Sequence, residues 1–167
     1  MSKARGFTII EIVVILGIIA LLTSSLILYS RSGERQVILF REQSRIISAL
    51  SRAKSLALAT FGQPDVPCGY GVHFEARRTF LIFKDLSFDC ATSDHRYSGG
   101  EEVVESFELS PVISFDALPI TDVVFIPPDP TVILTPDQEQ AIIFLKTTDG
   151  RGSAFIKLTS AGQISTR

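Results

Sequence analysis

The sequence has few of the residues and motifs on which enzymes and metal proteins depend. It contains no tryptophan, and its two cysteines, Cys68 and Cys90, lack a close Cys or His partner at the spacing of a zinc site. No G-x-S-x-G, H-E-x-x-H or glycine-rich phosphate-binding loop occurs, and His73 and His95 lie far from any nucleophile motif. These absences predict a protein that is not an enzyme and needs neither a metal ion nor a cofactor.

The net charge is also small. It is −2 at pH 7, so no general role in binding polyanions follows from it. Arg41, Arg45 and Arg52 form one short basic row, which favours a solvated face or a subunit contact over nucleic acid. Three aspartates, Asp85, Asp89 and Asp94, lie around Cys90 but lack the spacing of a calcium loop. They are therefore expected to be solvated acids of a loop.

The N-terminus is apolar over a length that suits a membrane. Lys3 and Arg5 precede the apolar run, and from Phe7 to Ser30 the only ionisable side chain is that of Glu11. About 20 apolar residues cross a hydrocarbon core as a helix, and the basic leader predicts a cytoplasmic N-terminus with the rest exported.

Three readings of this segment compete. A cleaved secretory signal would have a shorter apolar stretch, and here apolar residues continue after the small ones in LTSSLILYS. An ordinary single-pass anchor fits the length but leaves Glu11 unexplained. A carboxylate in lipid costs a few kcal/mol, so a functional partner for it is expected. The third reading places a cut before the apolar segment.

The residues ARGFTIIE support this third reading. They resemble the class III signal of type IV pilins and type II secretion pseudopilins, with Gly6 before the cut, Phe7 as the new N-terminus and Glu11 four residues later. The resemblance implies cleavage between Gly6 and Phe7 by a prepilin peptidase, which also methylates the Phe7 amine. It further implies other pilin or pseudopilin subunits, membrane lipid and an inner-membrane assembly platform as partners.

Cleavage would give Glu11 a role in assembly. The new amine at Phe7 is positive, and in stacked subunits it would lie beside the Glu11 carboxylate of a neighbour, so that each charge is neutralised. The alternative is that Glu11 reaches the lipid headgroups from near the helix end.

A single helix is expected from Thr8 to about Thr60, since no proline precedes Pro64. It would be about 80 Å long, more than a compact domain of this size needs. Its second half is periodic, and the apolar stripe predicted to face a core comprises Phe40, Gln43, Ile46, Ile47, Leu50, Ala53, Lys54, Ala57, Leu58 and Phe61.

From Gly69 onwards the pattern is that of short strands. The β-rich runs are GYGVHFE, TFLIFKD, EEVVESFEL, VISFDAL, DVVFIPP, TVILT, QAIIFLKTT, SAFIKLTS and QIST. The prolines of IPPDPT exclude a central strand and predict an edge or a crossover. The loop from Asp89 to Glu102 looks mobile and is a candidate for partner contact. In an exported chain, a Cys68–Cys90 disulfide is favoured over two buried thiols.

Together these observations predict an α+β, pilin-like fold: a long N-terminal α-helix, its first half transmembrane, packed on an antiparallel sheet. The expected parts are a leader (residues 1–6), a transmembrane half-helix (7–30), an amphipathic half-helix (31–61) and a β-rich globular domain (62–167). The strand pattern is most similar to the GspH/FimT group of minor pseudopilins.

The predicted function is that of a structural subunit, minor rather than major because SSLILYS lacks the mid-segment proline of many major pilins. The chain would span the cytoplasmic membrane once, with its globular domain outside, before entering a periplasmic pseudopilus or an extracellular pilus. The alternative is a membrane-anchored binding module or a signal-bearing secreted enzyme that forms no fibre.

Overall fold

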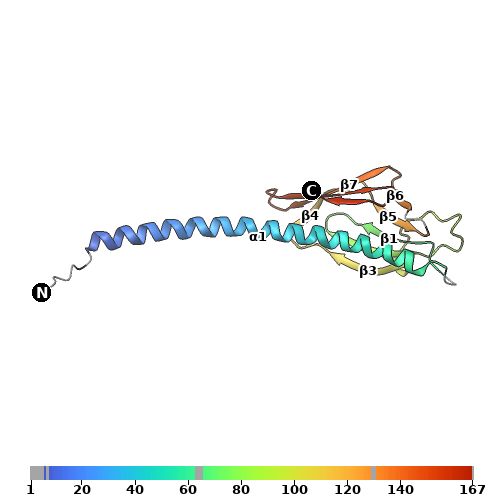
Figure 1. The fold of residues 1–167 in the computed structure, drawn as a ribbon, viewed down its shortest axis with the longest axis horizontal. Helices are drawn as coiled ribbons and strands as arrows, with labels where there is room; N and C mark the ends of the chain where they lie inside the picture. Colours follow the sequence, from blue (N-terminus) through green and yellow to red (C-terminus); the bar gives the residue numbers. More distant parts are fainter. Residues whose placement is uncertain (1–5, 7, 63–65, 129–130, 167) are drawn as a thin grey trace. The chain divides into compact units, whose positions relative to one another are not determined.

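The protein is described by a computed structural model that covers residues 6, 8–62, 66–128 and 131–166, with the backbone alone for residues 27–32 (Figure 1). The chain divides into two compact units, Met1–Gln36 and Val37–Arg167. The second is called the head unit below. The 52-residue helix α1 (Ile9–Thr60) contributes to both units, as the sequence predicts.

The N-terminal unit contains an apolar helical stretch, Ile9–Leu26, of which no residue is buried in this chain. This stretch has a mean hydropathy of 2.6. Two of its hydroxyls are satisfied within the helix, because Thr23 donates to the Ile19 carbonyl and Ser24 to that of Leu21, both at 2.8 Å. Such a surface needs lipid or other apolar helices to cover it.

In the head unit, α1 buries one face in the core, and the middle of the predicted stripe is confirmed, because Gln43, Ile46, Leu50, Ala53 and Ala57 are buried. The prediction is wrong at Phe40, Leu58 and Phe61, which were expected to face the core and are 57%, 48% and 55% exposed. The prediction also left out Leu39, Glu42 and Ala49, which are buried. The alanines explain the difference, since small side chains let the helix approach the sheets closely and leave the larger flanking ones outside.

In the part of the chain that the structure describes, nine strands form two antiparallel sheets, and Figure 1 labels several of these strands. The five-stranded sheet has the order β3-β2-β1-β5-β6 and the four-stranded sheet the order β4-β7-β8-β9. The strand bounds are β1 Gly69–Phe74, β2 Thr79–Asp85, β3 Val103–Glu108, β4 Ile113–Ala117, β5 Asp122–Ile126, β6 Thr131–Thr135, β7 Gln140–Thr147, β8 Ser153–Thr159 and β9 Ile164–Thr166. A short 3-10 helix, Gly100–Glu102, precedes β3.

The observed fold class is the predicted α+β arrangement, with two sheets in place of one. Period-two patterns mark strands without naming their partners, and β4 pairs with β7 rather than with β3. The prolines lie outside any central strand, as expected. Pro127 and Pro128 follow β5 in the connection to β6, which is the edge strand of the five-stranded sheet, so the edge alternative is confirmed and the crossover is not observed.

The five-stranded sheet is covered on both faces. Side chains such as Val72, Phe80 and Val123 join α1 and the four-stranded sheet in the main core. The opposite face, called the outer face below, carries a second cluster made of Leu81, Phe83 and Val124 with Tyr97, Val103 and Ile126. Tyr97 belongs to residues 86–99, which follow β2 and are called the head loop below.

Candidate functional site

The processing site predicted between Gly6 and Phe7 lies at the border of the described structure. Gly6 is exposed, and an added Cβ there would meet no atom within 4 Å. Phe7 is outside the described residues. The proposed cut and methylation therefore remain predictions from the sequence.

Glu11 forms a capping box at the start of α1. The backbone N–H of Thr8 donates to Glu11 Oε2 at 3.3 Å, and the N–H of Glu11 donates to Thr8 Oγ1 at 3.4 Å. This reciprocal pair satisfies N–H groups that have no partner within the helix. The sequence feature that predicts this capping box is the Thr-x-x-Glu spacing of Thr8 and Glu11. The sequence-based prediction for Glu11 considered only its charge and missed this capping box.

The cap gives Glu11 a local role beside any role in assembly. Its carboxylate is held in the first turn of α1, where the helix dipole favours a negative charge. It is fully exposed in the single chain, so it remains accessible to a positive group of another molecule.

In the head unit, the head loop is held by three buried carboxylates, those of Asp85, Glu102 and Asp122, which are 1%, 8% and 4% exposed. Glu102 accepts the N–H of Leu86 at 3.3 Å and that of Ser98 at 2.6 Å, so it ties together the two ends of the loop.

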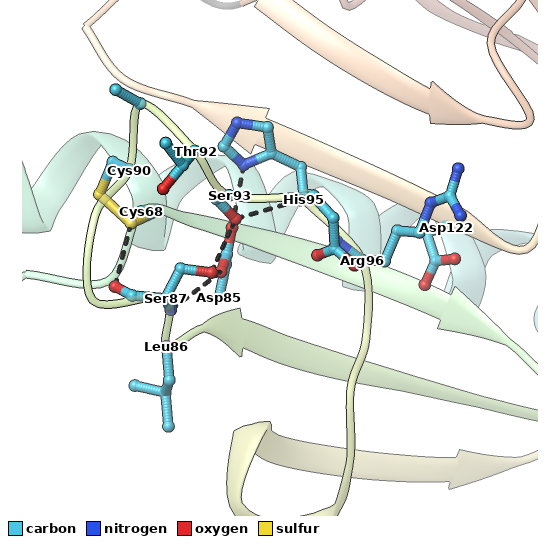
Figure 2. Close-up of polar contacts among 12 residues, drawn as sticks. Cys68, Asp85, Leu86, Ser87, Cys90, Thr92, Ser93, His95, Arg96 and Asp122 are labelled. Atoms are coloured by element: carbon cyan, nitrogen blue, oxygen red, sulfur yellow. Dashed lines mark hydrogen bonds and ion pairs between the residues drawn. A yellow bond between two sulfur atoms is a disulfide. The ribbon is translucent and has the colours of Figure 1, made fainter.

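Asp85, the last residue of β2, is the centre of the network drawn in Figure 2. Ser87 Oγ donates to Asp85 Oδ1 at 2.8 Å, and Ser93 Oγ donates to Oδ2 at 2.5 Å. His95 Nδ1 lies 2.9 Å from the same Oδ2. Because the hydroxyl of Ser93 bonds to the carboxylate and not to the imidazole, these contacts organise the loop and do not form a nucleophile–base relay.

A second carboxylate–histidine pair lies on the outer face of the sheet. His73 of β1 and Asp122 of β5 are cross-strand neighbours, with Nδ1 2.7 Å from Oδ1. The same oxygen accepts the N–H of Tyr97 at 3.3 Å, and the rings of His73 and Tyr97 have centroids 4.7 Å apart. Tyr97 is thus fixed over the outer face, where it also contacts the Phe83 ring.

A disulfide joins Cys68, just before β1, to Cys90 in the head loop, with a Cα–Cα distance of 5.0 Å. A cross-link that closes a 22-residue separation is worth about 3 kcal/mol in the chain-entropy account. The loop that the sequence marks as mobile therefore has a covalent tie in addition to its hydrogen bonds.

The sequence offered no sign of these buried pairs. Asp85 was expected to be a solvated loop acid and is buried, since β2 extends to it and turns its side chain to the outer face. Asp89 and Asp94 are exposed as expected, and each accepts a backbone N–H two residues later. Among the residues that the structure describes, no three His, Cys, Asp or Glu side chains come together as metal ligands.

The two buried aspartates should make the stability of the head unit depend on pH. Burial by itself would raise the pKa of Asp85, but hydrogen bonds from Ser93, Ser87 and His95 outweigh it and hold the pKa below its ordinary value of 3.8. For Asp122, burial is likewise outweighed by the bonds from His73 and Thr121, so its pKa is also lowered. A lowered folded-state pKa stabilises the fold fully above the ordinary value and progressively less as the pH falls below it.

We therefore expect the free energy of unfolding of the full chain in detergent to fall between about pH 5 and pH 2. Urea titrations across this range measure it. Asp85→Asn should be less stable at neutral pH and should show a shallower loss on acidification. An Asp85→Asn slope equal to that of the unsubstituted chain would contradict the assignment.

The fold and these sites define a class of architecture. An apolar N-terminal helix continues into a helix packed on antiparallel sheets, which is a pilin-like arrangement. The apolar stretch indicates a membrane anchor or signal, and the disulfide indicates an extracytoplasmic domain. Comparison of the chain with protein-family models, curated proteins and solved structures finds no match.

Proposed function

We propose that the chain is a structural subunit of a type IV pilus or a type II secretion pseudopilus. A prepilin peptidase would cut it between Gly6 and Phe7 and methylate the new amine. The subunit would then wait in the cytoplasmic membrane and join other subunits through the inner-membrane assembly platform.

The observation that carries this proposal is the state of α1. Its first 18 residues are strongly apolar apart from Glu11 and none of them is buried, while the same helix continues into the core of a disulfide-bonded head unit. A lipid bilayer can cover the apolar stretch in the stored subunit, and neighbouring helices can cover it in a fibre. The same surface thus serves two successive environments.

The position of Glu11 supports assembly over simple anchoring. A simple anchor gains only the helix cap from a carboxylate near one end of its apolar stretch, whereas a fibre also gains a partner for each terminal amine. The missing mid-segment proline favours a minor subunit that primes the fibre or lies at its tip. Membrane lipid and the prepilin peptidase complete the proposed partners.

The test is the N-terminal sequence of the form found in membranes. We expect mass spectrometry of the full chain to show a first residue of N-methyl-Phe7, and to show the uncut chain in cells without an active prepilin peptidase. An intact Met1, or a cut after Ser25, would instead indicate an anchored module or a secreted protein without a fibre.

A further inference from the structure

The head loop carries a side chain that nothing in this molecule covers. Phe88 is 107% exposed, and Leu86 beside it is 46% exposed. Figure 2 shows Leu86 pointing away from the Asp85 network that fixes the loop. Leu86 also lines a hollow of about 290 Å³ with residues 98–102. An exposed aromatic side chain on a loop whose backbone is already fixed is well suited to anchor an interface. Because the loop is already ordered, binding costs little conformational entropy.

The head loop that carries Phe88 and the short 3-10 helix that follows it are acidic. Asp89, Asp94 and Glu101 are all exposed, whereas the single exposed cation of the head loop is Arg96. A complementary surface should therefore offer apolar contact beside positive charge. An anionic membrane surface does not meet this requirement, since the acids would repel it.

The opposite end of the same sheet carries an excess of positive charge, since its four arginines outnumber the three acids among them, Glu42, Glu75 and Glu108. In the β1–β2 pair, Gly69 faces Asp85 at the head-loop end, and Phe74 faces Phe80 at the other end. The turn after Phe74 lies five residues away along the strand, about 17 Å. The two ends are therefore separate surfaces.

Four arginines and an exposed phenylalanine belong to that far end. Arg45 Nη1 donates to the Glu108 carbonyl at 2.9 Å, and Arg78 Nη2 lies 3.4 Å from the Glu108 carboxylate, which brings α1, the β1–β2 turn and β3 together. Arg41 lies one turn before Arg45 on α1, next to Phe40, which is 57% exposed. We call the surface formed by Phe40, Arg41, Arg45, Arg77 and Arg78 the arginine end.

We propose that the head loop of one copy docks, through Phe88, on the arginine end of a second copy. This inference rests on the proposed function. The two surfaces differ and lie at opposite ends of the sheet, so the contact is heterologous, and repeating it builds an open filament and not a closed pair. Guanidinium groups can stack on the Phe88 ring while they pair with the surrounding carboxylates. A priming complex that contains at least two copies of this chain would allow this contact to form.

Mixed thiol cross-linking in membranes tests this contact. Full-length copies with Ala91→Cys on the head loop are co-expressed with differently tagged copies carrying Ala76→Cys in the β1–β2 turn. Both positions are exposed, and the native cysteines are joined in the disulfide, so a short bis-maleimide reacts with the new thiols alone. Phe144→Cys, on the exposed side of β7, replaces Ala76→Cys as the matched control.

The expected result is a mixed dimer from Ala91→Cys and Ala76→Cys copies, little product with the Phe144→Cys control, and a lower yield in high salt. Adding Phe88→Ser to the Ala91→Cys copy should lower the yield by on the order of tenfold or more. Dimers formed by Ala91→Cys copies alone would indicate a two-fold contact and overturn the proposal.

An unchanged yield with Phe88→Ser, or a yield no higher than the control, would also overturn it. If this happens in chains that begin at Phe7 and enter fibres, the head-to-tail contact is wrong and the proposed function stands. If the chains retain Met1, the proposed function itself fails.

Discussion

Glu11→Ala should leave the chain cleaved and inserted but reduce its incorporation into fibres by about tenfold or more. Insertion should persist, because the substitution removes a charge from an apolar segment and lowers the cost of placing it in lipid. Incorporation should fall, since the amine at Phe7 of the neighbouring subunit would be left without its partner, a loss of about 3 kcal/mol when the site is buried. The measurement is the ratio of the chain in sheared fibres to the chain in membranes.

Because Glu11 also caps α1, two further variants separate the charge from the cap. Glu11→Gln keeps a side chain that can complete the capping box but removes the charge. Thr8→Ala removes the capping hydroxyl, at a cost of about 1 kcal/mol, and keeps the charge. Charge pairing predicts that Glu11→Gln assembles as poorly as Glu11→Ala and that Thr8→Ala assembles nearly normally.

The opposite ranking would show that the cap is what assembly needs. Normal incorporation of both Glu11 variants would remove any role for the carboxylate in the fibre. The proportion of each variant that begins at Phe7 serves as the control, since a chain that is not cut cannot report on pairing.

Gly71→Ala should destabilise the head unit by about 3 kcal/mol or more, with a fall in melting temperature of about 10 °C. An added Cβ at Gly71 would lie 2.7 Å from the Phe83 ring and 2.7 Å from the Val123 carbonyl oxygen. The ring is fully buried under the head loop, and the carbonyl is part of the central strand β5, so neither can move cheaply. Thermal unfolding of the full chain in detergent, followed by circular dichroism, measures the change.

Gly100→Ala is the matched control in the same unit. An added Cβ there would meet no atom within 4 Å, so the substitution should change stability by less than about 0.5 kcal/mol. A Gly71→Ala chain as stable as the Gly100→Ala chain would contradict the tight packing of the outer face around Gly71.

Local patterns were enough to predict most of the secondary structure. Absence of proline and continuous apolar or periodic sequence placed the helix from Thr8 to about Thr60, and it is observed as Ile9–Thr60. The β-rich runs correspond to the nine strands, and β2 (Thr79–Asp85) matches its run residue for residue. These successes share a cause, because each depends on neighbours in the sequence.

The errors arose where distant residues decide the outcome. The buried face of α1 depends on how closely two sheets approach its alanines, so Phe40 was placed inside although it lies outside. The pairs His73–Asp122 and His95–Asp85 were also missed, because their members are 49 and 10 residues apart and meet only in the folded chain. A histidine in a strand gives no local sign that a carboxylate of the next strand will meet it.

The disulfide between Cys68 and Cys90 also determines when the head loop that carries Phe88 reaches its cross-linked form. Two thiols must lose two electrons to an oxidant before that bond exists, and the cytosol keeps thiols reduced. Under the proposed function, a newly made copy in the cytosol would have a head loop without this disulfide, and a copy whose head unit has crossed the membrane would acquire it. The proposed docking surface on the head loop would therefore be complete only after export, in the compartment where other subunits are available to bind it.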